Sequence, residues 1–243
     1  MSETHIQPGS TPGTSTALVL VLCVVLLDIL GLGLIIPVLP FYARDFGADG
    51  LHVGLVFTAF AGLNFLTTPV LGTLSDRWGR RPILLFGLAG EAVAYVIMGF
   101  ANSLAVLYVS RALGGGTAGN VSAARAYLAD ISSHQERTRM LGLFGATFGV
   151  GLLIGPAVGG LLSQIDARAP AFGAAALMIL NLLFGLALLP ESLPPERRSN
   201  NARLSQLNPF FVLLTLLARP TLRGPLTAIF LAFFAFSCFQ TNF

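Results

Sequence analysis

The chain has 243 residues, of which 54% are hydrophobic and only 10% are charged, and its mean hydropathy is +0.78. A soluble domain carries about 25% charged residues, so a surface of this composition cannot face water on all sides. The net charge of +3 does not indicate nucleic-acid binding, because the basic residues lie in short loops between apolar runs and form no stripe on a polar face.

The chain begins with a polar stretch, 1–15, which is rich in Ser, Thr, Pro and Gly and predicts a disordered tail. The apolar run that follows, 16–41, is about twice as long as the core of a secretory signal and predicts a transmembrane helix. About 20 apolar residues cross a membrane as a helix. By this measure, residues 16–189 are predicted to form an all-α membrane bundle of six transmembrane helices. The first is 16–41, and the other five are 51–74, 82–101, 104–128, 140–163 and 170–189.

A polar linker with Pro and Arg residues, 190–221, separates this bundle from a seventh predicted span, 222–243. Within the linker, 204–217 is rich in apolar residues but too short to cross the bilayer. Two interpretations are open: an interfacial helix on the membrane surface, or a loop helix packed on the bundle.

Arginine is divided unequally between alternate loops. Two arginines lie on one side, Arg44 and Arg168. The other side holds Arg77, Arg80, Arg81, Arg137, Arg139, Arg197, Arg198, Arg203, Arg219 and Arg223. Because basic residues accumulate in cytoplasmic loops, we expect a multi-pass protein of the inner (plasma) membrane with its N-terminus and linker in the cytoplasm.

The loop after the second span carries the strongest local signal, Gly72-Thr-Leu-Ser-Asp76-Arg77-Trp-Gly79-Arg80-Arg81-Pro82. We expect Gly72 to allow close helix approach and Gly79 to permit a tight turn. Asp76 is expected to pair with a helix N-terminus or an arginine. Asp130, at the end of the fourth span, is predicted to pair with Arg80 and latch the cytoplasmic end shut. An ordinary positive-inside loop explains the arginines but not the Gly and Asp positions.

Polar residues inside the spans are candidates for function, because a charge there costs several kcal/mol unless it is paired, protonated or wet. Asp28, near the middle of the first span, is the predicted proton carrier; alternatively it is a protonated residue bonded to a neighbouring helix, and the two do not exclude each other. Arg111 is expected to face a central cavity and to bias the protonation of a nearby acid. Alternatively, its side chain extends outward to the membrane interface. Asn64 either lines the cavity or bonds another helix.

Three stretches of the sequence resemble signatures of the major facilitator superfamily. The loop 72–81 has every position of G-x-L-x-D-R-x-G-R-R/K. Residues 151–160 resemble the signature of the superfamily's antiporters through Gly151, Gly155, Pro156, Gly159 and Gly160. Arg111-Ala-Leu-Gly-Gly115 is similar to R-x-x-Q-G, with Gly114 in place of Gln. The first span is similar to tetracycline exporters, as are the stretches 126–130 and 189–194.

The resemblance implies a fold of two six-helix bundles with substrate held between them. Glu91 lies three positions before the acid that relatives often carry, on nearly the same helix face. We interpret it either as the counterpart of that acid or as a protonated residue that packs between helices. Gln240 stands where relatives often carry Glu, so a polar substrate contact is expected there instead of a proton role. The Gly155-Pro156 bend is expected either to limit leakage or simply to pack.

The sequence thus predicts a proton-coupled antiporter that exports small amphiphilic drugs, such as tetracycline-like compounds, by alternating access. It uses the proton gradient and no cofactor. Neither a phosphate-binding G-x-x-x-x-G-K-[ST] loop nor a catalytic or metal cluster is present, so an enzyme or ATP-driven pump is not expected. The expected partners are the bilayer, a small molecule, protons and a missing C-terminal half, in cis or in trans. Two alternatives remain: a porter for sugars or metabolites, and a half-transporter that moves nothing alone.

Overall fold

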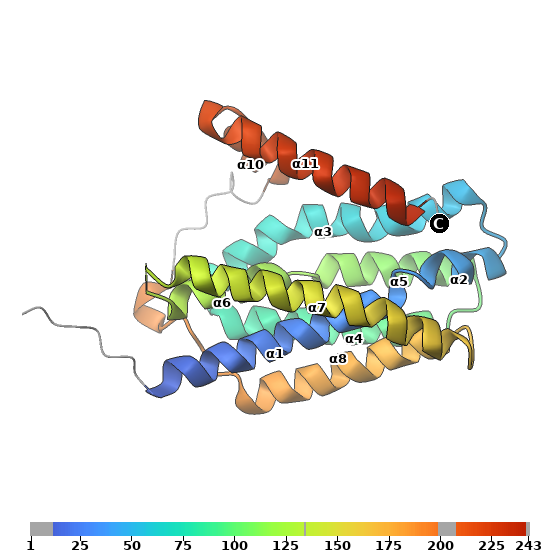
Figure 1. Ribbon diagram of the computed structural model, residues 1–243, viewed down its shortest axis with the longest axis horizontal. Helices are drawn as coiled ribbons and strands as arrows, with labels where there is room; N and C mark the ends of the chain where they lie inside the picture. Colours follow the sequence, from blue (N-terminus) through green and yellow to red (C-terminus); the bar gives the residue numbers. More distant parts are fainter. Residues whose placement is uncertain (1–11, 134, 199–207, 242–243) are drawn as a thin grey trace, which may run out of the picture.

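The computed structural model describes residues 12–133, 135–198 and 208–241, and the side chains of these ranges apart from 12–15, 233 and 236–241. These ranges contain helices and no strand, which confirms the all-α fold class. Five of their helices are long and apolar enough to cross a membrane. They are α1 (Pro12–Ile35), α3 (Gly50–Trp78), α4 (Arg80–Gly99), α7 (Arg137–Ser163) and α8 (Ala169–Leu188), which lie side by side as a bundle (Figure 1).

The first predicted span is shorter than expected, because α1 ends at Ile35 and a separate helix, α2 (Leu39–Asp45), follows. Proline explains the interruption: Pro37 and Pro40 have no N–H to donate to the preceding turn. The Tyr42 hydroxyl then fastens α2 to the end of α4 by donating to the Met98 carbonyl at 2.9 Å.

The predicted fourth span is wrong as one continuous helix. The structure has two, α5 (Leu104–Thr117) and α6 (Asn120–Ile131), separated by Ala118 and Gly119. Glycine has low helix propensity, and the Gly119 N–H donates to the Thr117 carbonyl at 2.7 Å instead of to the turn before it. Leu71 of α3 occupies the space beside Gly119, 2.6 Å from where a Cβ would lie. The break is buried in protein, as irregular backbone at membrane depth must be.

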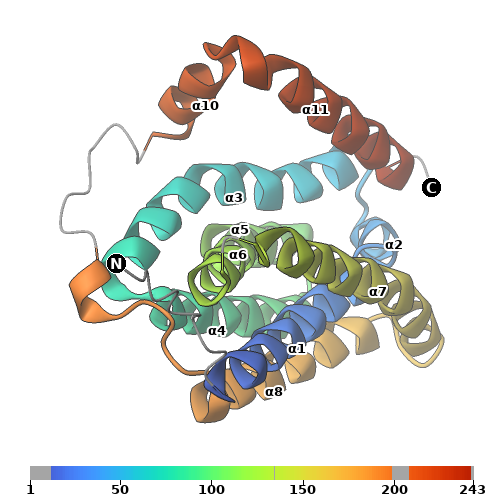
Figure 2. The same cartoon turned by 60° about the vertical axis from the view of Figure 1, so that its left-hand side comes forward.

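The C-terminal segments lie outside the bundle. A 3₁₀ turn, η1 (Pro195–Arg197), precedes α10 (Pro209–Leu217) and α11 (Pro220–Thr241), which lie along the α3 side of the bundle in both views (Figures 1 and 2). Asn208 caps α10, and its side chain accepts from the Phe210 N–H at 3.0 Å. The Phe210 ring packs edge-on against Phe65 of α3, 5.4 Å between centroids. The division into bundle, linker and seventh span stays a prediction.

Helices α1 and α7 pack closely together, and glycine makes this contact possible. Gly151, Gly155 and Gly159 recur every four residues, so they lie on one face of α7. A Cβ at Gly155 would be 2.6 Å from the Gly33 Cα, and one at Gly151 would be 2.7 Å from the Ile29 Cγ2. Gly159 is likewise closed off by the Leu34 carbonyl. This part of the antiporter-like stretch therefore has a packing role.

We expect Gly155→Ala to destabilise the bundle by about 1–3 kcal/mol, because the added methyl overlaps the α1 backbone, which cannot rotate away. Gly160→Ala is the matched control, since nothing lies within 4 Å of a Cβ there. Thermal unfolding of both variants in detergent tests this. Equal melting temperatures for the two variants would contradict the packing role.

Candidate functional site

Four buried polar side chains from four helices meet inside the bundle. Asp28 of α1 is 6% exposed, Glu91 of α4 is 8% exposed, and both Arg111 of α5 and Asn120 of α6 are 3% exposed. The sequence singles out the first three, but only the fold brings them together. Asn120 is the one of these four residues that sequence reasoning missed.

Asp28 and Asn120 are joined directly: the Asn120 Nδ2 donates to the Asp28 Oδ1 at 2.6 Å. The Glu91 carboxyl, on α4, is buried close to these two side chains. The predicted proton carrier thus lies beside a second acid that belongs to another helix. Two neighbouring carboxylates in an apolar interior repel each other, so this arrangement suits groups that exchange a proton.

Arg111 supplies the only cation among the described side chains of this cluster. Its guanidinium lies between the rings of Tyr95, 5.2 Å from the centroid, and Phe60, 5.8 Å from the centroid. It also acts electrostatically on Glu91. Its Nε is buried without a hydrogen-bond partner. This burial is incompatible with snorkelling to the membrane surface.

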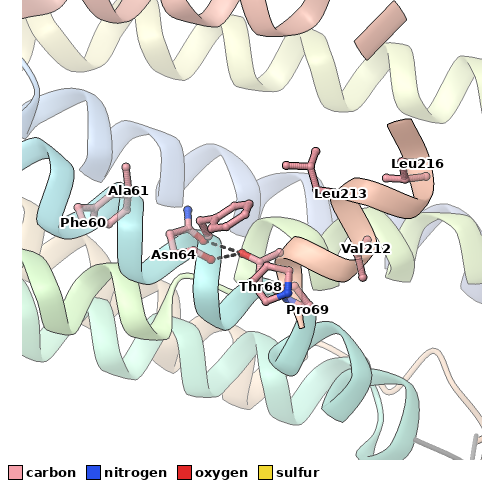
Figure 3. Close-up of a pocket in the computed structure, with 10 residues that line it drawn as sticks. Phe60, Ala61, Asn64, Thr68, Pro69, Val212, Leu213 and Leu216 are labelled. Atoms are coloured by element: carbon pink, nitrogen blue, oxygen red, sulfur yellow. Dashed lines mark hydrogen bonds between the residues drawn. The ribbon is translucent and has the colours of Figure 1, made fainter. Parts of the chain in front are cut away.

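Asn64 lies apart from this cluster, in an apolar pocket of about 460 Å³ between α3 and α10 (Figure 3). Its Oδ1 accepts from the Thr68 hydroxyl at 2.7 Å. Phe60 lines the same pocket and its ring also faces the Arg111 guanidinium, so the pocket and the buried charges share this residue. The rest of the lining is Ala61, Phe65, Thr68, Pro69, Pro209, Val212, Leu213 and Leu216. The side chain of Gln240 lies outside the described residues.

A second polar cluster lies at the arginine-rich end, where α3 turns into α4. The Arg80 Nε donates to the Asp130 Oδ2 at 2.9 Å, so the expected ion pair is present. Arg80 also pairs with Asp76 of its own loop and donates to the Ser75 hydroxyl at 3.3 Å. The pair joins the start of α4 to the end of α6. Its role as a latch stays a prediction.

The remaining residues of the loop differ in their surroundings. Arg77 is exposed, whereas the Arg81 Nη2 donates to the Leu186 carbonyl at 2.7 Å. Gly79 has a φ of +111°, which favours glycine as expected. No described residue lies within 4 Å of where a Cβ of Gly72 would be, so close helix approach at this glycine stays a prediction.

Sequence reasoning did not single out Glu191, which caps α4 from the stretch after α8. Its carboxylate accepts the backbone N–H groups of Arg80 at 2.8 Å and of Arg81 at 3.2 Å. It also closes the space beside Gly79, where a Cβ would collide with it. The signal was indirect: the residue at the α4 N-cap is Gly79, which has no capping side chain, so the first N–H groups of α4 need a distant acceptor.

Comparisons with known proteins agree with this architecture. The family model described as Major Facilitator Superfamily matches residues 21–243. The chain is 45% identical over 188 residues to the Escherichia coli tetracycline resistance protein, class C, covering 76% of this chain and 48% of the relative. It is 31% identical over 218 residues to the Staphylococcus aureus quinolone resistance protein NorA, covering 89% and 55%.

Among solved structures, the human organic anion transporter MFSD10 (TETRAN) superimposes with a TM-score of 0.73 at 28% identity, covering 82% of this chain and 54% of the other. The chain spans about half the length of the curated relatives it matches.

Replacing the α4 cap tests the arginine-rich end. We expect Glu191→Ala to cost about 1–3 kcal/mol of unfolding free energy, because buried N–H groups lose their acceptor. Denaturant unfolding in detergent measures this cost. Glu196→Ala is the matched control, an exposed acid on the same connecting segment. If both variants unfold like the wild type, the cap has no energetic importance.

Proposed function

The chain belongs to the Major Facilitator Superfamily, a family of membrane transporters and not of enzymes, and we propose that it exports small amphiphilic drugs, such as tetracycline-like compounds, in exchange for protons by alternating access. We place it in the inner membrane with its N-terminus and arginine-rich end in the cytoplasm. Residues 16–189 are the N-terminal bundle, which works with a C-terminal bundle in cis or in trans.

One observation carries this proposal: Asp28 and Glu91 are buried together beside Arg111 in an otherwise apolar bundle. A proton held by two adjacent carboxyls is released when water or a positive charge reaches them, and it is regained when they are closed off again. Arg111 cannot give up its proton usefully, so it favours the state in which one carboxyl is ionised. The cluster can therefore load and unload a proton without a cofactor.

The surroundings of this cluster support a drug as the exchanged substrate. The pocket beside Asn64 is lined mainly by apolar and aromatic side chains, which suits an amphiphilic compound better than a sugar. Several relatives are named for resistance to tetracycline or to quinolones. Phe60, shared by the pocket and Arg111, is the physical contact through which an occupied pocket can affect the acids.

Neutralising Asp28 tests the proton coupling. We expect Asp28→Asn to lower drug transport driven by a pH gradient at least tenfold, because an amide cannot carry a proton between the two sides. The measurement uses inverted membrane vesicles that contain this chain together with the C-terminal half of the class C tetracycline resistance protein. Asp45→Asn, which changes an exposed acid, is the control and should transport normally. A fully active Asp28→Asn would falsify its coupling role.

The latch can be tested in the same vesicles. Asp130→Asn keeps the size of the side chain but removes the charge that holds Arg80, so the cytoplasmic end should open more often. We expect faster labelling of a cysteine placed at Ser132 by a membrane-impermeant reagent, and transport reduced severalfold. Glu136→Gln, an exposed acid close by, should change neither. Unchanged labelling and transport in Asp130→Asn would remove the latch from the mechanism.

A further inference from the structure

Helices α3 and α5 meet at a pair of glycines, and Phe60 of α3 lies at the meeting point. The Phe60 carbonyl oxygen stands where a Cβ of Gly115 would be, so the two backbones are in contact. Further along α3, the Thr67 hydroxyl donates to the Gly115 carbonyl at 3.3 Å. The backbone of α3 at Phe60 is therefore fixed against α5, and only the side chain of Phe60 has room to change its place.

The second glycine, Gly114, leaves the space in which the Phe60 ring lies. A Cβ at Gly114 would be 3.6 Å from the Phe60 Cε2 and 3.5 Å from the Ala94 Cβ of α4. A methyl group fits at these distances, but a longer side chain would have to pass between the ring and α4. The Ser110 hydroxyl holds α5 to α4 by donating to the Ala94 carbonyl at 2.9 Å. The Phe60 ring is thus the part that would have to move.

Arg111 gives the ring a reason to stay beside α5. It lies one turn before Gly114, and its guanidinium carbon is 5.8 Å from the centroid of the Phe60 ring. The Arg111 side chain is buried, and its Nε has no hydrogen-bond partner in the described part of the chain. A buried cation is attracted to the face of an aromatic ring, so this contact keeps the Phe60 ring against α5.

We propose that Gly114 sets the width of the drug pocket, because it allows the Phe60 ring to lie against α5 instead of inside the pocket. Phe60 borders this pocket of about 460 Å³ together with Asn64, one turn further along α3 (Figure 3). A ring displaced from α5 enters the pocket, since this is the open volume that the residue borders. The signature R-x-x-Q-G has Gln where this chain has Gly114, so the chain departs from the signature at the position that determines the size of the pocket.

This inference rests on the proposed function, to which it adds a substrate class. A pocket of this volume is large enough for a drug-sized molecule, and its lining is mainly apolar. With the Phe60 ring held aside, the pocket takes a bulky amphiphile with several fused rings. With the ring inside the pocket, the remaining space suits only smaller molecules.

Binding of radiolabelled tetracycline to this chain in lipid nanodiscs tests the inference without transport. Empty nanodiscs give the background of drug that dissolves in the lipid. We expect the wild-type chain to bind above this background and Gly114→Gln to bind at least tenfold more weakly, because the displaced ring fills part of the pocket. Wild-type binding that does not exceed the background would contradict the inference.

Gly116→Gln is the matched control, because it adds the same side chain to the same helix where nothing lies within 4 Å of a Cβ. It should bind tetracycline as the wild type does. In a Phe60→Leu background there is no ring to displace, so adding Gly114→Gln should weaken binding less than twofold. An equal loss in Gly116→Gln, or the full loss in the Phe60→Leu background, overturns the proposal.

Phe60→Trp replaces Gly114→Gln if that variant is not produced. The indole is larger than the space beside Gly114, so it extends into the pocket and should weaken tetracycline binding at least threefold. Unchanged binding in Phe60→Trp overturns the proposal.

The binding result is separate from the transport result. Binding that depends on Gly114, together with no proton-driven transport in the vesicles, supports the role of Gly114 and rejects the proposed function. Transport in the vesicles with binding that ignores Gly114→Gln rejects the role of Gly114 alone.

Discussion

An unpaired charge inside an apolar helix bundle costs several kcal/mol of free energy. Several contacts between helices in this chain reduce that cost by giving the buried charges partners. Asp28 and Glu91 lie together, and Arg111 lies between two aromatic rings. Asn120 completes the cluster from the start of α6, where the helical backbone has just been interrupted. The break is itself tolerated because it is buried against α3 and α4, where the glycines of α4 leave room for it.

The same requirement organises the arginine-rich end. The first N–H groups of α4 have no local cap, and Glu191 reaches them from beyond α8. Arg80 forms ion pairs with Asp76 of α3 and Asp130 of α6. Together with the Glu191 cap, these pairs bring α3, α4, α6 and the stretch after α8 to one point. Both clusters use the same two helices: α4 carries Arg80 and Glu91, and α6 carries Asn120 and Asp130. A movement of α6 against α4 would therefore disturb the acid pair and the arginine-rich end together.

The apolar pocket and the buried charges are separate but adjacent. The pocket beside Asn64 offers a surface for an amphiphilic molecule, whereas the acid pair is closed to solvent. Phe60 belongs to both, because its ring lines the pocket and faces the Arg111 guanidinium. Under the proposed function, the proton and the drug would occupy different sites, and Phe60 would be the contact between them.

The sequence by itself determined the apolar spans, the turn at Gly79 and the glycine face of α7, because hydrophobic length and residue spacing are local properties. It also indicated that Asp28, Glu91 and Arg111 needed partners, since charge is costly at that depth. Tertiary structure alone decided which residues those partners are. The break in the fourth span is packed against Leu71 and the α4 glycines, which lie far from Gly119 and Thr117 in the sequence. Asn120 reaches Asp28 across 92 residues, and Glu191 reaches Arg80 across 111. Periodicity reports that a residue is buried, but not what it is buried against.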